Sequence, residues 1–290
     1  MADLECSFDS MGTSWHISVW DDIPEPTFRA LEQTIRAYCS IFDHTYSRFI
    51  KESFISELAD KIGVQEVPPD FTQILRMYED LFKASGEKFT PLVGNTLSDM
   101  GYDVTYSLQR KKSVRPVPHF LKTIAIIDDR HIDITEKVTI DIGAIGKGFA
   151  VDALANILEL RGVTHYLVDG SGDICYRGPG PIKVGLEHPL DVKKVIGSID
   201  FSSGAMCGSA TNRRSWQGQH HIIDPHSMSS TTDIIAAWVI ADTAALADGL
   251  STALFLCTPE QCEKDFSFEY LLLNKDLKVK RSAGFNAELY

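Results

Sequence analysis

The stretch Val138-Thr-Ile-Asp-Ile-Gly-Ala-Ile-Gly-Lys-Gly-Phe-Ala-Val-Asp152 decides the fold. Its first five residues, 138–142, alternate apolar and polar side chains, which predicts a β-strand. The three glycines that follow predict a tight turn opening a helix over 146–160. A glycine-rich turn at a helix N-terminus lets backbone N–H groups approach a phosphate. The stretch therefore predicts a strand, a turn and a helix that can bind a pyrophosphate.

The turn differs from two common phosphate-binding patterns. Only two residues separate Gly143 from Gly146, and no Ser or Thr follows Lys147, so it is not a Walker A loop. It also lacks the Gly-x-Gly-x-x-Gly order of dinucleotide-binding folds. The Lys147 ammonium can meet a phosphate oxygen, but a glycine-rich turn needed only for close packing explains the same residues. The turn alone leaves both interpretations open.

The rest of the chain predicts short strands mixed irregularly with helices. Strands are expected over 14–20, 124–127, 131–134, 166–169, 183–186, 195–201 and 234–241, and further helices over 27–42, 71–83 and from 242 or 243 to 256. Residues 104–117 predict a loop or an edge hairpin. The connections are too irregular for a strict βαβ repeat. The pattern favours an α+β fold of mixed sheets with helices packed on them, without an internal boundary.

Composition excludes several classes of function. The 290 residues carry 28 Lys and Arg against 40 Asp and Glu, a net charge of −12, which argues against nucleic acid as the main partner. The sequence contains no run of 18 apolar residues, so no membrane span is predicted. The six scattered cysteines are typical of reduced thiols, and the first residues show no secretory pattern. We therefore expect a cytoplasmic protein.

A second segment predicts a cation site. Asp248 and Thr252 are four residues apart on the last expected helix, so their oxygens share one helical face. A carboxylate and a hydroxyl suit a hard cation such as Mg²⁺. The alternative is an exposed helical turn, which the apolar neighbours Leu250 and Leu254 disfavour.

A third segment, Gln219-His-His-Ile-Ile-Asp-Pro225, carries two adjacent histidines. Either can supply a general base, since imidazole titrates near neutral pH, and either can be structural. A zinc site made of His220, His221, Cys257 and Cys262 is a further alternative, although its spacing fits no common zinc pattern.

Taken in order, these segments resemble the ApbE family, the FAD:protein FMN transferases, over almost the whole chain. The resemblance implies a single ApbE-like domain over residues 1–290. Its motifs are Met11-Gly-Thr13, Ser47-Arg-Phe49, Phe89–Gly94, Asp141–Asp152, Gly170–Asp173, His221–Pro225 and Ala247–Thr252.

The resemblance also implies roles for individual residues. Family enzymes use Mg²⁺ to cleave FAD, attach FMN to a Ser or Thr hydroxyl of an acceptor flavoprotein, and release AMP. By this resemblance, the residues expected to bind FAD are Met11, Phe49, Phe89, Thr90, Pro91, Asp141, Lys147 and Ile222. The metal ligands are the main-chain oxygen of Ala144, Asp248, Thr252 and, as an additional ligand, Ser251. His221 is the expected general base.

Two departures from the family pattern concern the acceptor side. The stretch around Cys207-Gly-Ser209 replaces the usual Thr-Ser-Gly, and Asp224–Met228 lacks the usual glycine. Two alternatives therefore stay open. One is a Mg²⁺-dependent FAD pyrophosphatase that yields FMN and AMP, and the other is a catalytically silent FAD-binding protein.

Overall fold

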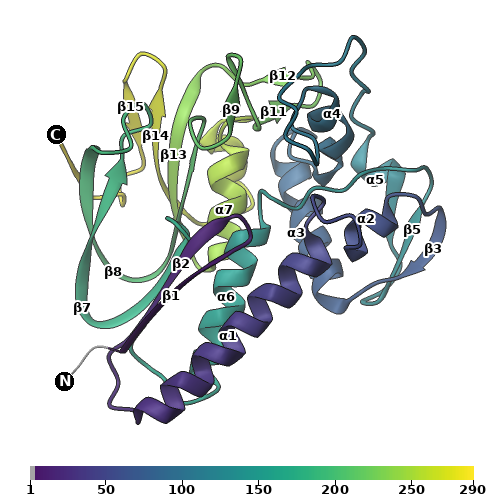
Figure 1. Cartoon of the computed structure of the whole chain (residues 1–290). Helices are drawn as coiled ribbons and strands as arrows, with labels where there is room; N and C mark the ends of the chain where they lie inside the picture. The colour runs from purple at the N-terminus through teal and green to yellow at the C-terminus, as the bar shows by residue number, and fades with distance from the viewer. Residues whose placement is uncertain (1–3) are drawn as a thin grey trace.

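A nine-stranded antiparallel sheet dominates the structure, a computed structural model that describes residues 4–290 (Figure 1). Its strands follow the order β1-β2-β6-β7-β8-β13-β14-β15, and β16 also pairs with β8. The bounds are β1 Leu4–Ser10, β2 Thr13–Val19, β6 Tyr166–Asp169, β7 Ile174–Glu187, β8 Val195–Ala210, β13 Ile234–Ala241, β14 Glu269–Asn274, β15 Val279–Arg281 and β16 Ala287–Leu289.

The central strands of this sheet are apolar on both faces. Along β13, Ala237 and Val239 pack into the main core under the helices, whereas Ala236 and Trp238 pack into a second apolar cluster on the opposite face. Successive strand residues point to opposite faces, so a strand covered on both sides reads as a continuous apolar run. Gly208 of β8 lies opposite Trp238, and a Cβ there would lie 3.0 Å from the indole Cδ1.

Helices cover one face of the sheet, with α6 and α7 at the centre of Figure 1. The long helix α1 begins after Pro24, carries Pro26 in its first turn, and buries Phe28, Leu31 and Ile35 at helical spacing. The bounds are α1 Glu25–Tyr46, α2 Phe54–Leu58, α3 Pro69–Ala84, α4 Gly94–Asp99, α5 Phe120–Thr123, α6 Gly146–Glu159, α7 Ala244–Ala253 and α8 Pro259–Cys262.

Reciprocal hydrogen bonds join α6 to α7. The Asp152 carboxylate of α6 accepts from the backbone N–H groups of Ala244 and Ala245, both at 2.8 Å, and so caps α7. In return, Asp248 of α7 accepts from the backbone N–H of Gly148 at 3.0 Å. The helices approach so closely that a Cβ on Gly148 would lie 2.2 Å from the Ala244 carbonyl oxygen. Glycine is therefore required at 148 for this contact.

Smaller elements surround this core. Three strands form a sheet in the order β3-β5-β4, on the far right of Figure 1. Two short hairpins, β9–β10 and β11–β12, lie near the helix α4. The bounds are β3 Gly63–Glu66, β4 Ile124–Ile126, β5 His131–Ile134, β9 Ser215–Trp216, β10 Gln219–His220, β11 Ile223–Asp224 and β12 Ser229–Ser230.

The prediction of a strand over 138–142 is wrong. Val138, Ile140 and Ile142 are buried and alternate with less buried neighbours, as in a strand. Among residues 4–290 no strand pairs with this segment, and the Asp141 N–H donates instead to the carbonyl of Pro91 at 2.7 Å. Alternation therefore reported one-sided burial of an extended loop rather than sheet pairing.

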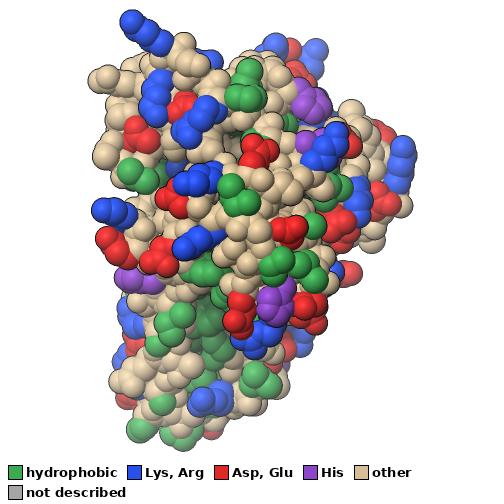
Figure 2. Space-filling view, turned by 90° about the vertical axis from the view of Figure 1, so that its right-hand side faces the viewer, with side chains coloured by type: hydrophobic (Ala, Val, Ile, Leu, Met, Phe, Trp, Pro, Cys, Tyr) green, Lys and Arg blue, Asp and Glu red, His purple; other side chains and the backbone are tan. Residues whose placement is uncertain are grey.

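The other main elements agree with the sequence. The expected α+β fold is confirmed, as are the helix over 146–160, the strand over 234–241 and the loop over 104–117. Within residues 4–290, no helix is both long and apolar enough to cross a membrane. On the face drawn in Figure 2, acidic and basic side chains are interspersed.

Candidate functional site

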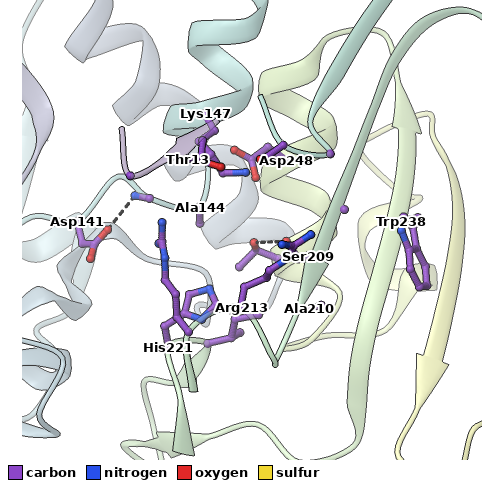
Figure 3. A pocket seen from close by; sticks show the side chains of 18 of the residues that line it. Thr13, Asp141, Ala144, Lys147, Ser209, Ala210, Arg213, His221, Trp238 and Asp248 are labelled. Atoms are coloured by element: carbon purple, nitrogen blue, oxygen red, sulfur yellow. Dashed lines mark hydrogen bonds between the residues drawn. The ribbon is translucent and has the colours of Figure 1, made fainter. Parts of the chain in front are cut away.

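A cavity of about 560 Å³ is lined by residues of the large sheet, the helix α7 and the loops around them (Figure 3). Two segments contribute several of its charged groups. One is the glycine-rich turn, residues 141–148, and the other is the histidine segment, residues 213–223. In Figure 3, Lys147 and Asp248 lie together at one end of the cavity, His221 lies below them, and Trp238 lies beyond a strand of the sheet. The volume is within the range of small-molecule sites.

Asp141 holds the glycine-rich turn in place. Its carboxylate accepts from Arg48 Nε at 2.6 Å and from the Gly143 N–H at 2.8 Å. Burial alone would raise the pKa of Asp141, but the Arg48 guanidinium outweighs it and the pKa lies below its usual value. Asp141 is therefore a charged, internally paired anchor.

Lys147 is also paired inside the protein. Its ammonium lies against the carboxylate of Asp173, whose side chain is fully buried. Burial lowers the pKa of Lys147, but the charges of Asp173 and Asp248 together with the hydrogen bond to Asp173 outweigh it, so the pKa is raised and the lysine is charged. The second oxygen of Asp173, Oδ1, is buried without a hydrogen-bond partner in the described structure. The predicted phosphate-binding lysine thus already has a carboxylate partner.

Asp248 presents a poorly compensated carboxylate to the cavity. It accepts from the Gly148 N–H, and no lysine or arginine forms an ion pair with it within residues 4–290. Burial first, and then repulsion from Asp173, raise the pKa of Asp248 well above its usual value. A cation bound here would stabilise the ionised form.

The neighbouring hydroxyls belong to one hydrogen-bonded group. Ser209 Oγ lies 2.7 Å from Ser251 Oγ and 3.1 Å from Thr252 Oγ1. Ser251 also donates to the Asp248 carbonyl at 2.9 Å. Ala144 and Thr252 line the cavity with Asp248, whereas Ser251 is fully buried and is not among the lining residues.

The two adjacent histidines differ in their environments. His220 Nε2 lies 2.8 Å from the Thr231 carbonyl oxygen, and its Nδ1 accepts from the Ile222 N–H at 3.3 Å. His221 lines the cavity, and its Nδ1 is buried without a partner in the described structure. Burial, followed by the nearby Arg214 charge, lowers the pKa of His221 to about 3. His221 is therefore neutral and able to accept a proton.

The two adjacent arginines both line the cavity but differ in their ion pairing. Arg213 pairs with Glu187 at 2.8 Å. Arg214 lines the cavity opposite the glycine-rich turn, and a Cβ on Gly143 would lie 3.9 Å from Arg214 Nη1. The Arg214 carbonyl accepts from the His221 N–H at 3.2 Å, which fixes the two residues relative to each other.

Two separate apolar walls enclose this polar centre. One comes from the large sheet and includes Ile174, Met206 and Trp238. The other comes from a different apolar cluster and includes Leu97 and Tyr102. A ligand with a charged middle and two flat, largely apolar ends matches this arrangement.

The structure places most of the predicted site residues on the cavity. Those that line it are Phe89, Thr90, Asp141, Ala144, Lys147, His221, Ile222, Asp248 and Thr252. Three predicted FAD contacts are not among the lining residues. Met11 precedes the lining residue Gly12. The Pro91 carbonyl accepts a hydrogen bond from the Asp141 N–H. Phe49 stacks on Tyr106, with ring centroids 5.1 Å apart. Their roles stay predictions.

Sequence reasoning missed several lining residues, including Thr13, Asp169, Ser209, Arg214 and Trp238. The Arg213-Arg214 pair, close in sequence to the two histidines, could have indicated that an arginine lines the site. Trp238 gave none, because it lies in a continuous apolar strand. The zinc alternative is not formed, since no group of three or more His, Cys, Asp or Glu side chains within 4–290 could hold a metal ion.

Comparisons with known proteins point to one family. The model of a family described as the ApbE family matches residues 11–267. An FAD:protein FMN transferase of Klebsiella pneumoniae is 31% identical over 156 residues, which make up 50% of this chain and 44% of that protein. An FAD:protein FMN transferase of Haemophilus influenzae is 26% identical over an alignment that covers 97% of this chain and 90% of that protein.

A solved structure supports the fold. The crystal structure of the ApbE protein of Thermotoga maritima matches with a TM-score of 0.86 and 24% identity, covering 98% of both chains. At that identity the match is evidence for the fold alone.

Proposed function

Because the chain belongs to the ApbE family, we propose that it is an FAD:protein FMN transferase. In this proposal the enzyme cleaves the pyrophosphate of FAD, attaches FMN to a Ser or Thr hydroxyl of an acceptor flavoprotein, and releases AMP. A cytoplasmic location stays a prediction of the sequence.

One observation carries the proposal. A single cavity brings together the poorly compensated carboxylate of Asp248, the unpartnered imidazole of His221 and two separate apolar walls. FAD has a charged pyrophosphate between two aromatic ring systems, so its chemistry matches this division of the cavity.

The residues around Asp248 fit Mg²⁺. They offer oxygen donors only, and the raised pKa of Asp248, caused by burial and by Asp173, shows that the protein itself compensates this charge poorly. Asp248, Thr252 and the main-chain oxygen of Ala144 would hold the ion, while Ser251 is hydrogen-bonded to Ser209. When bound, Mg²⁺ supplies positive charge that stabilises phosphate oxygens.

His221 would act on the acceptor hydroxyl. The hydroxyl oxygen forms a bond to the phosphorus of the FMN half, the bond from that phosphorus to the bridging oxygen breaks, and AMP leaves with that oxygen. The hydroxyl proton passes to the neutral imidazole of His221. The anionic pyrophosphate would raise the pKa of His221 from its low value in the free protein, which makes the imidazole a stronger base in the complex.

The test uses the full chain with FAD, Mg²⁺ and a co-expressed candidate flavoprotein. AMP release and the intact mass of the acceptor are both measured, with the His221→Ala variant as the matched control. The proposal expects AMP and an FMN adduct on a Ser or Thr of the acceptor, both lost in the variant. AMP without an adduct would indicate an FAD pyrophosphatase, and neither product would indicate a silent FAD-binding protein.

A further inference from the structure

The charges of the cavity are unevenly paired. Four lysine or arginine side chains line it, namely Lys88, Lys147, Arg213 and Arg214. Lys88 pairs with Asp224 at 3.0 Å, and Lys147 and Arg213 pair with Asp173 and Glu187. Within residues 4–290, Arg214 alone among the four has no carboxylate in ion-pair contact. Its guanidinium is therefore the cation left for a ligand.

The position of Arg214 links the two polar parts of the cavity. Its Nη1 lies close to Gly143 of the glycine-rich turn, and its carbonyl is bonded to the backbone of His221. Asp248, the expected cation ligand, and His221, the expected base, line the same cavity as Arg214. A phosphate between these two groups would lie within reach of the guanidinium.

The chemistry of arginine suits such a ligand. A guanidinium is planar, always charged, and donates two parallel N–H bonds to phosphate oxygens. Lys147 is not free to bind a phosphate in this way, because moving its ammonium to a phosphate would leave the fully buried Asp173 carboxylate without its cation.

We propose that Arg214 binds non-bridging oxygens of the substrate's pyrophosphate, next to the phosphorus that is attacked, and that Lys147 is instead the structural partner of Asp173. This inference rests on the proposed function for the identity of the substrate. It assigns to the histidine segment the phosphate-binding role that the sequence suggested for the glycine-rich turn.

The test compares ligand binding by calorimetry in Arg214→Met, Arg214→Lys and the matched control Arg213→Met. FAD and riboflavin are titrated separately, because riboflavin has the flavin ring without the pyrophosphate. We expect Arg214→Met to weaken FAD binding by about tenfold to a hundredfold and to leave riboflavin binding unchanged. Arg214→Lys should lie between wild type and Arg214→Met, and Arg213→Met should change FAD affinity less than about threefold.

Each outcome decides the inference. Equal FAD affinity in wild type and Arg214→Met overturns it, and so does an equal loss of FAD and riboflavin binding, which indicates a structural role. If Arg214→Met does not fold, FAD affinity of Arg214→Lys equal to wild type overturns it. Binding does not require transfer, so a wild type that binds FAD through Arg214 but forms no adduct contradicts the proposed function alone.

Discussion

The glycine-rich turn and the histidine segment face the same cavity, but their polar side chains are treated differently. In the turn, Asp141 is bonded to Arg48, and Lys147 is bonded to Asp173. In the histidine segment, Arg214 and His221 reach the cavity without such partners in the described structure. The comparison separates a scaffold from a reactive surface. Groups paired within the protein fix the shape of the site, and unpaired groups are available to ligands.

The histidine segment repeats this division within itself. Arg213 is bonded to Glu187, and His220 is bonded to the Thr231 carbonyl. The side chain of the next residue in each case, Arg214 or His221, faces the cavity without such a partner in the described structure, although Arg213 lines the cavity as well. Adjacent residues of one type therefore divide into a structural member and an available member.

The largest expected effect concerns Asp248 of α7, a buried carboxylate with no ion-pair partner among residues 4–290. Asp248→Asn keeps an oxygen that can accept from the Gly148 N–H but removes the charge that a cation needs. We expect Mg²⁺-dependent AMP release to fall at least about 10³-fold, because metal stabilisation of phosphate oxygens contributes several kcal/mol. The melting temperature should stay near that of wild type, because the buried Asp248 has no ion pair to lose among the described residues. Thr252→Ala should reduce activity less, and full activity in Asp248→Asn would contradict the metal site.

The next effect separates the two histidines. His221→Ala should lower turnover by about 10²-fold or more and leave FAD affinity nearly unchanged, because a general base acts on the nucleophile. His220→Gln is the comparison, and its main expected effect is on stability, through the lost bond to Thr231. As the pKa of free His221 is about 3, kcat/KM should show no loss from its protonation between pH 7 and 5. Wild-type turnover in His221→Ala would make both histidines structural.

A third variant tests whether Lys147 belongs to the scaffold. Lys147→Met leaves the fully buried Asp173 without its cation, so the free energy of unfolding should fall by about 3 kcal/mol. The double variant Lys147→Met/Asp173→Leu removes both charges and should recover part of that loss. Denaturant unfolding measures all three proteins. If Lys147→Met is as stable as wild type but no longer binds FAD, Lys147 contacts the ligand and is not a structural residue.

The smallest effect is a pH dependence of stability. Burial lowers the pKa of His221 to about 3 from an unfolded value near 6.5, so between these values the unfolded chain holds a proton that the folded chain lacks. The free energy of unfolding therefore decreases as pH falls from about 6.5 towards 3, and this contribution is constant above 6.5. His221→Gln should show a shallower decrease than wild type in urea unfolding at pH 7, 6 and 5. Parallel curves would show that folding does not change the pKa of His221.

The sequence predicted the elements of the site better than their pairing. Local patterns located α6, β13 and α7, because helical periodicity and apolar runs depend on nearby residues. The strand expected over 138–142 was wrong because alternation reports burial and cannot report a missing partner strand. The first strand, β1, and the C-terminal strands were not predicted. β1 pairs locally with β2, with Ser10 opposite Thr13, whereas β16 pairs with the distant strand β8.

Charge pairing was beyond the reach of the sequence for the same reason. Lys147 and Asp173 are 26 residues apart, and Asp141 and Arg48 are 93 residues apart. Nothing local distinguishes a lysine with a buried partner from one that awaits a phosphate. Likewise, His220 and His221 differ only in what the folded chain places beside them.

The reciprocal bonds between α6 and α7 have a consequence for folding. They join residues 92 to 100 positions apart, so neither helix completes its partner's bonds until the intervening strands are in place. Contacts of such long sequence separation form late, because the chain must close a large loop first. The amides of Gly148, Ala244 and Ala245 should therefore exchange with deuterium at one common rate, as a single cooperative unit. A partly folded chain would then hold neither the cap on α7 nor a positioned Asp248.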